Sequence, residues 1–146
     1  MISAAMGPMI WRPDLSAAAY PTPADILRDL VSLKAREIEG LVDQGVNWIQ
    51  LDSLSYVQVI DAAFRSQTAP GVDPAILLGA AVTIDNQLIS AARARNPEVV
   101  VGLHVCRGNN RSAWMAEGGS EARPPTTQAG GRICAPHGLR AGDRHR

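Results

Sequence analysis

The stretch VVVGLHVC, residues 99–106, decides which fold the sequence predicts. It is short and apolar, and it follows Asn96-Pro97, a pair that ends a helix, so it predicts a strand covered on both faces. Side chains alternate along a strand, so His104 and Cys106 point to the same side. The chain has only two cysteines and three histidines. This spacing therefore indicates either two ligands of one metal site or a coincidence.

Periodicity and capping residues predict the elements upstream. Thr22 and Asp73 are good N-caps, and each is followed by a proline at the first helical position. Apolar residues recur at helical spacing after each cap, and a β-rich segment ending at Asp52 lies between the two helices. The expected elements are a helix over 23–44, a strand over 46–51, a short helix near 57–64, a helix over 74–95 and a strand over 98–104.

This order predicts an α/β fold with parallel strands joined by a crossover helix. In such folds the chemistry lies at the carboxyl ends of the strands, where Asp52 and His104 both fall. On the earlier strand Trp48, Gln50 and Asp52 share one face, and the opposite face is aliphatic. A polar inner face at the strand ends is typical of a barrel mouth. We therefore expect a fragment of a TIM (β/α)8 barrel.

Length and composition exclude several classes of protein. The 146 residues suffice for one domain with its own core. The formal net charge is zero, which argues against charge-driven binding to nucleic acid or to an anionic membrane. The apolar start of the chain has no basic region and meets Arg12-Pro13, so it predicts neither a membrane span nor a signal peptide. Two cysteines without such a signal predict a cytoplasmic protein with free or metal-bound thiols.

Composition changes near residue 119 and predicts two segments. Residues 1–119 hold nine basic and twelve acidic residues, whereas residues 120–146 hold five arginines and two acidic residues. The second segment is rich in Pro, Gly and Arg and has no periodicity, so we expect it to be disordered. A shifted reading frame after about residue 119 is one hypothesis for this abrupt change.

Four stretches resemble the C-terminal catalytic barrel of cobalamin-independent methionine synthase and its shorter relatives. They are WIQLD (48–52), DNQLISAARARNP (85–97), LHVCRGN (103–109) and SAWMAEGG (112–119). The most specific part is the H-x-C motif after an apolar strand, followed by R-G-N at the right distance from I-Q-L-D. The resemblance covers residues 1–119, under half of a barrel of about 250 residues, so it implies a partial barrel.

The resemblance implies zinc-dependent transfer of a methyl group from 5-methyltetrahydrofolate, usually polyglutamylated, to the thiol of homocysteine, giving methionine. By motif match, His104 and Cys106 are implied zinc ligands. Asp52 is similar to the aspartate that holds the amino group of the substrate. Imidazole and thiolate are ordinary zinc ligands, and the ion keeps a coordinated thiol deprotonated. The nitrogen of the methyl donor needs a proton as it leaves, and the sequence identifies no residue for that role.

The chain departs from the family pattern in three respects. Ser53-Leu54 follows the aspartate where the family usually has E-P. The first half of the barrel, with its Gly-Ser substrate loop, has no counterpart. No strand is predicted after residue 120 to present the remaining zinc ligands of the family, a glutamate and a second cysteine. Catalytic zinc normally takes three protein ligands, so we expect an incomplete site, and activity of the chain alone is left open.

Other interpretations of the same residues stay open. His104 and Cys106 also fit a buried strand with a hydrogen-bonded imidazole and a small apolar thiol, and Asp52 also fits a capping carboxylate. Cys134 and His137 would complete a rival Cys2His2 set. Related barrels that also use H-x-C transfer methyl groups to another thiol, such as coenzyme M. From a different class, a non-catalytic fragment or partner module would self-associate through open sheet edges.

Overall fold

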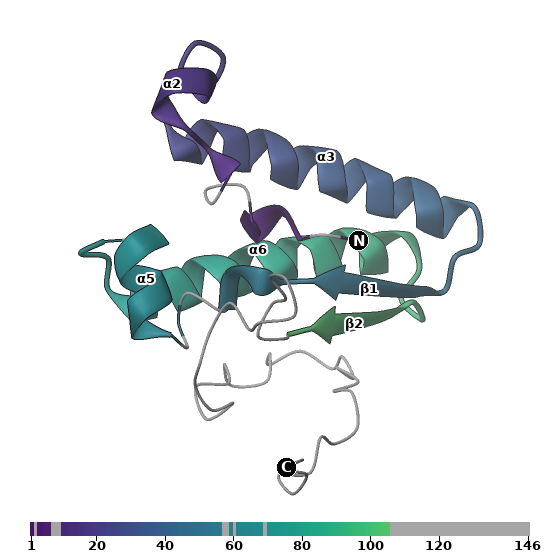
Figure 1. Ribbon diagram of the computed structural model, residues 1–146. Coiled ribbons are helices and arrows are strands. Elements are labelled where there is room, and N and C mark those ends of the chain that lie inside the picture. Colours follow the sequence, from purple (N-terminus) through teal and green to yellow (C-terminus); the bar gives the residue numbers. More distant parts are fainter. Residues whose placement is uncertain (2, 7–9, 57–58, 60, 69, 106–146) are drawn as a thin grey trace, which may run out of the picture.

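The computed structural model describes residues 1, 3–6, 10–56, 59, 61–68 and 70–105, arranged as in Figure 1. Two long helices and two strands make up most of the described structure. In chain order the elements are η1 (Ala4–Met6), α2 (Pro13–Ser16), α3 (Pro23–Asp43), β1 (Trp48–Asp52), η2 (Leu54–Tyr56), α5 (Ala62–Thr68), α6 (Pro74–Arg95) and β2 (Val100–His104).

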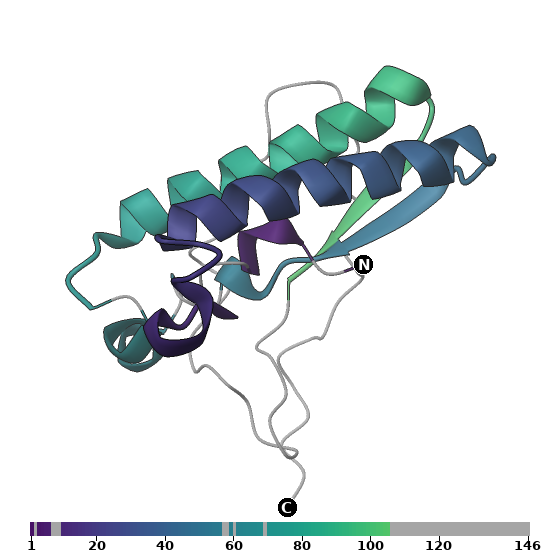
Figure 2. The same ribbon diagram turned by 90° about the horizontal axis from the view of Figure 1, so that it is seen from above.

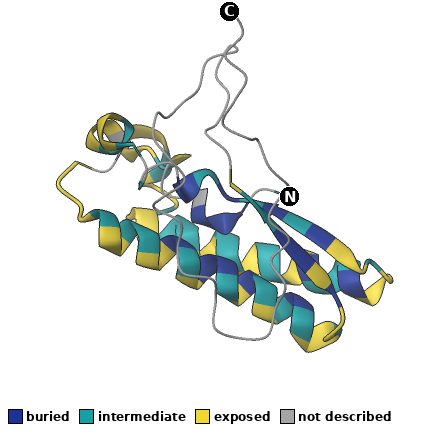
Figure 3. Ribbon diagram, turned by 90° about the horizontal axis from the view of Figure 1, so that it is seen from below, coloured by how far each residue is buried: buried dark blue, intermediate teal, exposed yellow. Residues whose placement is uncertain are grey.

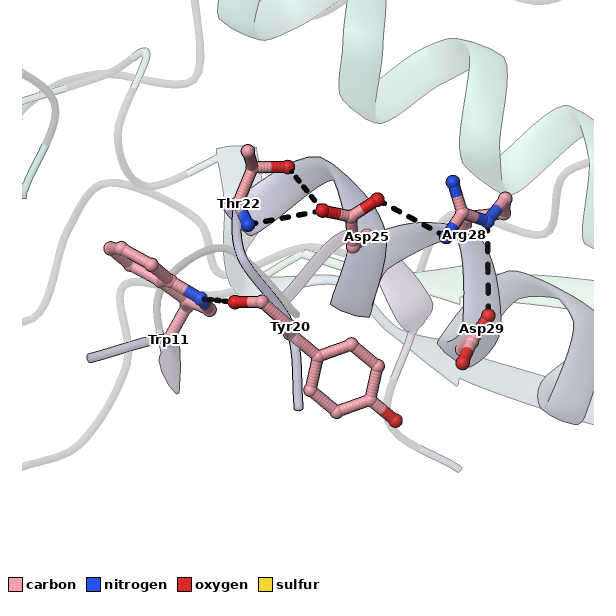
Figure 4. A network of polar contacts seen from close by, with 6 residues as sticks. All are labelled: Trp11, Tyr20, Thr22, Asp25, Arg28 and Asp29. Carbon is pink, nitrogen blue, oxygen red and sulfur yellow. Dashed lines mark hydrogen bonds and ion pairs between the residues drawn. The ribbon is translucent and has the colours of Figure 1, made fainter. Parts of the chain in front are cut away.

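Helix α3 begins and ends at residues suited to its termini. The Asp25 carboxylate accepts hydrogen bonds from the backbone N–H (3.0 Å) and the hydroxyl (2.7 Å) of Thr22, as Figure 4 shows. Pro23 occupies the first turn, where its missing N–H has no helical partner to lose. The bonds from Thr22 and an ion pair with Arg28 at 3.1 Å lower the pKa of Asp25. Gly45, with a positive φ of 93°, follows the helix and lets the chain turn into β1.

Helix α6 also matches its prediction. The Asp73 carboxylate accepts a hydrogen bond from the Ala75 N–H at 2.8 Å, Pro74 opens the helix, and Asn96 follows its last residue. By length and composition alone, α6 could also cross a membrane. Within the described protein, its residues Ala81, Ile84, Leu88 and Ala92 are buried in the core.

Strands β1 and β2 are hydrogen-bonded parallel neighbours. The register runs residue for residue and ends with the pair Asp52 and His104. The first residues of the chain run along the other edge of β1. There the Asp52 N–H donates to the Met1 carbonyl (2.7 Å), and the Ser3 N–H donates to the Asp52 carbonyl (2.9 Å). Strand β1 is therefore hydrogen-bonded on both sides at its carboxyl end.

Apolar residues of the two long helices and the strands form one core. Helices α3 and α6 lie side by side over one face of the strands, as Figures 1 and 2 show from two directions. Figure 3 shows buried residues on both the strands and the helices that cover them. The buried apolar residues are Ala4, Ala5, Ile38, Val42, Ile49, Leu51, Tyr56, Ala81, Ile84, Leu88, Ala92, Val99 and Val101.

The predicted alternation of side chains along the strands is confirmed, but the expectation that the strand over 98–104 is covered on both faces is wrong, because Val100 is 37% exposed. Ile49, Leu51 and Val101 are buried in the core. Trp48 and Val100, which point the other way, are 54% and 37% exposed. The sheet therefore has one apolar face under the helices and one face that carries the polar residues of β1.

The prediction of a TIM-barrel fragment is wrong. The described residues form a two-stranded parallel sheet with helices packed over one face, and this sheet does not close. The mixed α/β character and the alternation of helix and strand are correct. Periodicity reports the type and order of elements, whereas a barrel requires strands that pair around a complete ring with matched tilt and stagger. The boundary expected between residues 119 and 120 lies outside the described residues.

Smaller differences concern element boundaries. The strands begin two residues later than predicted, at Trp48 and Val100. The short helix expected near 57–64 is α5, over Ala62–Thr68, and its start is set by the Asp61 carboxylate, which accepts from the Phe64 N–H at 2.8 Å. The short helices η1 and α2 were not predicted within 1–22, and residues 7–9 lie outside the described structure.

Candidate functional site at the strand ends

Asp52 and His104 end neighbouring parallel strands and are paired in register. Paired residues project to the same side of a sheet, so both side chains leave the face opposite the helices. Both are partly exposed. The structure therefore brings together two of the three predicted site residues, at an edge where solutes have access.

Cys106, the third predicted site residue, lies outside the described residues. His104 is the last residue of β2, so the predicted ligand pair begins where the strand ends. Within the part of the chain that the structure describes, no three or more His, Cys, Asp or Glu side chains lie close enough to hold a metal ion together. The rival ligands Cys134 and His137 also lie outside it.

The Asp52 carboxylate is oriented by its own strand. The Gln50 side chain points to the same face, two residues earlier, and its Nε2 donates to Oδ1 of Asp52 at 3.0 Å. Among the described residues, no group donates to Oδ2 of Asp52. Gln50 therefore holds one carboxylate oxygen, and the other has no donor among the described residues; a carboxylate oxygen can accept a hydrogen bond from a ligand such as an ammonium group.

The backbone around the two residues is also fixed. The Ser53 N–H donates to the His104 carbonyl at 3.0 Å, which ties the residue after β1 to the end of β2. On the other side of β1, the Ser3 N–H donates to the Asp52 carbonyl. Three chain segments thus meet at the candidate site, and their hydrogen bonds limit how far Asp52 and His104 can separate.

Trp48 lies on the same face as Asp52 but at the start of β1. Its ring covers Gly102, where Cζ2 lies 3.8 Å from the position that a Cβ would occupy. More than half of the Trp48 side chain remains exposed. The residue thus packs across the two strands and leaves an aromatic surface open to solvent.

A buried polar cluster behind the strand ends was not predicted. The Asp85 carboxylate, on α6, accepts hydrogen bonds from the Ser3 hydroxyl at 2.5 Å and from the Tyr56 hydroxyl at 3.0 Å. All three residues are at most 4% exposed. We call Ser3, Tyr56 and Asp85 the Asp85 cluster. A signal for it exists in the sequence, because Asp85 shares the inner stripe of α6 with the buried Ala81 and Leu88.

Burial and hydrogen bonding act in opposite directions on Asp85. Burial raises the pKa of Asp85, while the hydrogen bond from Ser3, the nearby Ser53 hydroxyl and the hydrogen bond from Tyr56 lower it. Burial is the largest influence, so the net shift is upward. Burial also raises the pKa of Tyr56, with a further contribution from the adjacent carboxylate, so Tyr56 stays a neutral donor. The Ser53 hydroxyl is fully buried and has no hydrogen-bond partner among the described residues.

Comparison with known proteins finds two similar proteins of Bacillus subtilis (strain 168), which carry the names uncharacterized protein YxjH and uncharacterized protein YxjG. The chain is 30% identical to YxjH over 105 residues, which are 70% of this chain and 27% of YxjH. It is 29% identical to YxjG over 99 residues, 67% of this chain and 25% of YxjG. The chain thus spans about a quarter of the length of these relatives. No family model and no solved structure matches it.

Proposed function

We propose that this chain contributes part of a zinc-dependent methyltransferase site that transfers a methyl group from a 5-methyltetrahydrofolate donor to the thiol of homocysteine. The observation that supports the proposal is the pairing of Asp52 with His104 at partly exposed strand ends. Two strands thereby offer an imidazole and a carboxylate to one solute from the same face. The H-x-C motif adds the thiol of Cys106 two residues after His104.

The residues at the strand ends fit part of a zinc site. His104 and Cys106 would hold the ion, since imidazole and thiolate are ordinary zinc ligands. When bound, zinc would keep the substrate thiol deprotonated at neutral pH, and the thiolate is the nucleophilic form. Catalytic zinc normally takes three ligands from the protein. The ligands other than His104 would therefore come from residues outside the described part of the chain.

Asp52 would position the substrate. Its oxygen Oδ2 would accept a hydrogen bond from the ammonium group of homocysteine, while Gln50 holds Oδ1. In the transfer, a carbon–sulfur bond forms as the carbon–nitrogen bond of the donor breaks. The product is methionine, and the donor nitrogen takes up a proton. A fixed carboxylate next to the reacting thiol would reduce the entropy lost on reaching this geometry.

Substrate binding to a cobalt-loaded chain tests the proposal. Co²⁺ takes the same kinds of ligand as zinc and gives the site a visible spectrum. Homocysteine should add a sulfur-to-metal charge-transfer band, whereas methionine, whose sulfur carries no ionisable proton, should not. The His104→Ala variant should lose both the cobalt spectrum and the response. A wild-type spectrum that is unchanged by homocysteine would contradict the proposal.

A non-catalytic role is favoured by a different observation. The sheet face opposite the helices exposes Trp48 and Val100, at 54% and 37%. Exposed apolar residues beside a sheet edge favour association, and a second copy of this chain would cover them. Sedimentation across a range of protein concentrations tests this role. Dimers that dissociate in a Trp48→Ser variant would support it, and a monomer at all concentrations would exclude it.

A further inference from the structure

Asp85 occupies an unusual position for a carboxylate. It lies on the inner stripe of an apolar helix and is 2% exposed. Burying a carboxylate is unfavourable unless hydrogen bonds compensate, and two hydroxyl donors do so here, from Ser3 and Tyr56. An apolar side chain at this position would fill the core without that cost. Packing of the core alone therefore does not account for a carboxylate at residue 85.

The two donors lie on either side of Asp52. Ser3 belongs to the segment beside β1, and its N–H donates to the Asp52 carbonyl. Tyr56 ends η2, the turn that follows Asp52 and Ser53. The Ser53 N–H in turn donates to the His104 carbonyl. Asp85 thus holds the segment before the site and the segment after it at the same time.

We propose that Asp85 is a positioning residue, which through Ser3 and Tyr56 fixes the backbone that presents Asp52 and His104. That the positioned residues bind zinc and substrate rests on the proposed function. That Asp85 fixes the backbone around Asp52 and His104 can be tested separately. Groups that hydrogen-bond directly to a metal ligand change metal affinity by about 10–100-fold when they are removed, and Asp85 acts one step further back, so we expect the lower end of this range.

Amide hydrogen exchange of the full chain tests the geometric part. In Asp85→Asn, the amides of Ser3 and Ser53 should exchange about tenfold faster, and in Tyr56→Phe the effect should be smaller. These two N–H groups donate to the carbonyls of Asp52 and His104, so their exchange reports how firmly the site segments are held together. The Val100 amide, which donates to the Asn47 carbonyl at the opposite end of the strands, serves as an internal reference and should not change.

The matched control is Asp43→Asn. Like Asp85, Asp43 joins two elements through its carboxylate: it pairs with Arg95 at 2.5 Å and so connects the ends of α3 and α6. Unlike Asp85, it is exposed and lies away from the strand ends that carry the site. This variant should leave Ser3 and Ser53 unchanged. Equal acceleration of all amides in Asp85→Asn and in Tyr56→Phe, or none in either, would overturn the proposal. Tyr56→Phe keeps the test decisive if Asp85→Asn does not fold.

Equilibrium dialysis against Zn²⁺ tests the link to the site. The wild-type chain and Asp43→Asn should bind Zn²⁺ equally, and Asp85→Asn should bind it about tenfold more weakly. Equal affinity in all three would overturn the positioning role. Absence of Zn²⁺ binding by the wild type would instead refute the proposed function, and the exchange rates would still decide whether Asp85 holds the strand ends.

Discussion

Asp52 and His104 are register partners at the ends of two parallel strands, although a long helix separates them in the sequence. The pairing follows from the crossover through α6, because strands that run in the same direction end at the same edge. Two polar side chains thereby share one exposed face, behind which lies an apolar core.

Truncation of Leu88 should strongly destabilise the protein. Leu88 is fully buried on α6, so Leu88→Ala should lower the free energy of unfolding by about 2–5 kcal/mol. Ile76, on the same helix, is 65% exposed, and Ile76→Ala should change the free energy of unfolding by less than about 1 kcal/mol. Urea denaturation followed by circular dichroism measures both. Similar losses in the two variants would show that α6 does not pack as described.

The Asp73 cap should contribute measurably to the stability of α6. Asp73→Ala removes the hydrogen bond to the Ala75 N–H and should cost about 1 kcal/mol. Asp73→Asn keeps an acceptor oxygen at the same place and should stay close to wild type. Thermal denaturation of the two variants measures the difference. An alanine variant as stable as the asparagine variant would contradict this role of the cap.

Stability should depend on pH through Asp85. Its pKa is raised above 3.8 in the folded state, so the folded protein keeps this proton to a higher pH than the unfolded chain does. The resulting stabilisation is complete below the unfolded pKa and is lost as the pH rises through the folded pKa. The stability of wild type relative to Asp85→Asn should therefore fall as the pH rises above about 4, by at most about 1.4 kcal/mol per pH unit.

Urea unfolding of both proteins across this range measures the pH effect. Asp25 and Asp43 have lowered pKa values, so their contributions are lost in the opposite direction, as the pH falls. Both carboxylates are present in wild type and in Asp85→Asn, so their contributions cancel in the difference in unfolding free energy between the two proteins. Parallel stability curves would mean that burial does not raise the pKa of Asp85.

Replacement of Asp52 should separate substrate binding from metal binding. Asp52→Asn keeps the shape and the oxygen that Gln50 holds but removes the charge. Loss of a charge-assisted hydrogen bond should weaken homocysteine binding by about 10–100-fold, while Zn²⁺ stays bound. A thiol of equal length without an amino group is the control, and the two proteins should bind it equally. Calorimetric titration provides the affinities, and unchanged homocysteine affinity would exclude the assigned role.

Local signals account for much of the fold. Thr22 and Asp73, each followed by proline, fixed the starts of the two long helices, and the alternation in β1 identified which face is buried. The open sheet was not predicted, since the pairing of strands around a ring depends on contacts that periodicity does not report. The inner stripe of α6 signals that Asp85 is buried, but its hydrogen-bond donors Ser3 and Tyr56 come from distant segments and cannot be read from that pattern.

For the candidate site, the sequence identified Asp52 and His104, and the structure places them as neighbours. Alternation along each strand fixed the face, and the parallel order of the strands fixed the edge. The role of Cys106 stays a prediction, as does zinc binding, since metal affinity depends on ligands that spacing in one strand does not identify.

The zinc content of purified full-length variants tests the central claim most directly. The wild type should bind about one zinc ion per chain, and this ion should be lost in His104→Ala and Cys106→Ser. Cys134→Ser and His137→Ala, the matched changes at the rival ligands, should retain it. Zinc that persists without Cys106, or that is lost equally on replacement of Cys134, would contradict the assignment of His104 and Cys106 as the ligands of a methyl-transfer site.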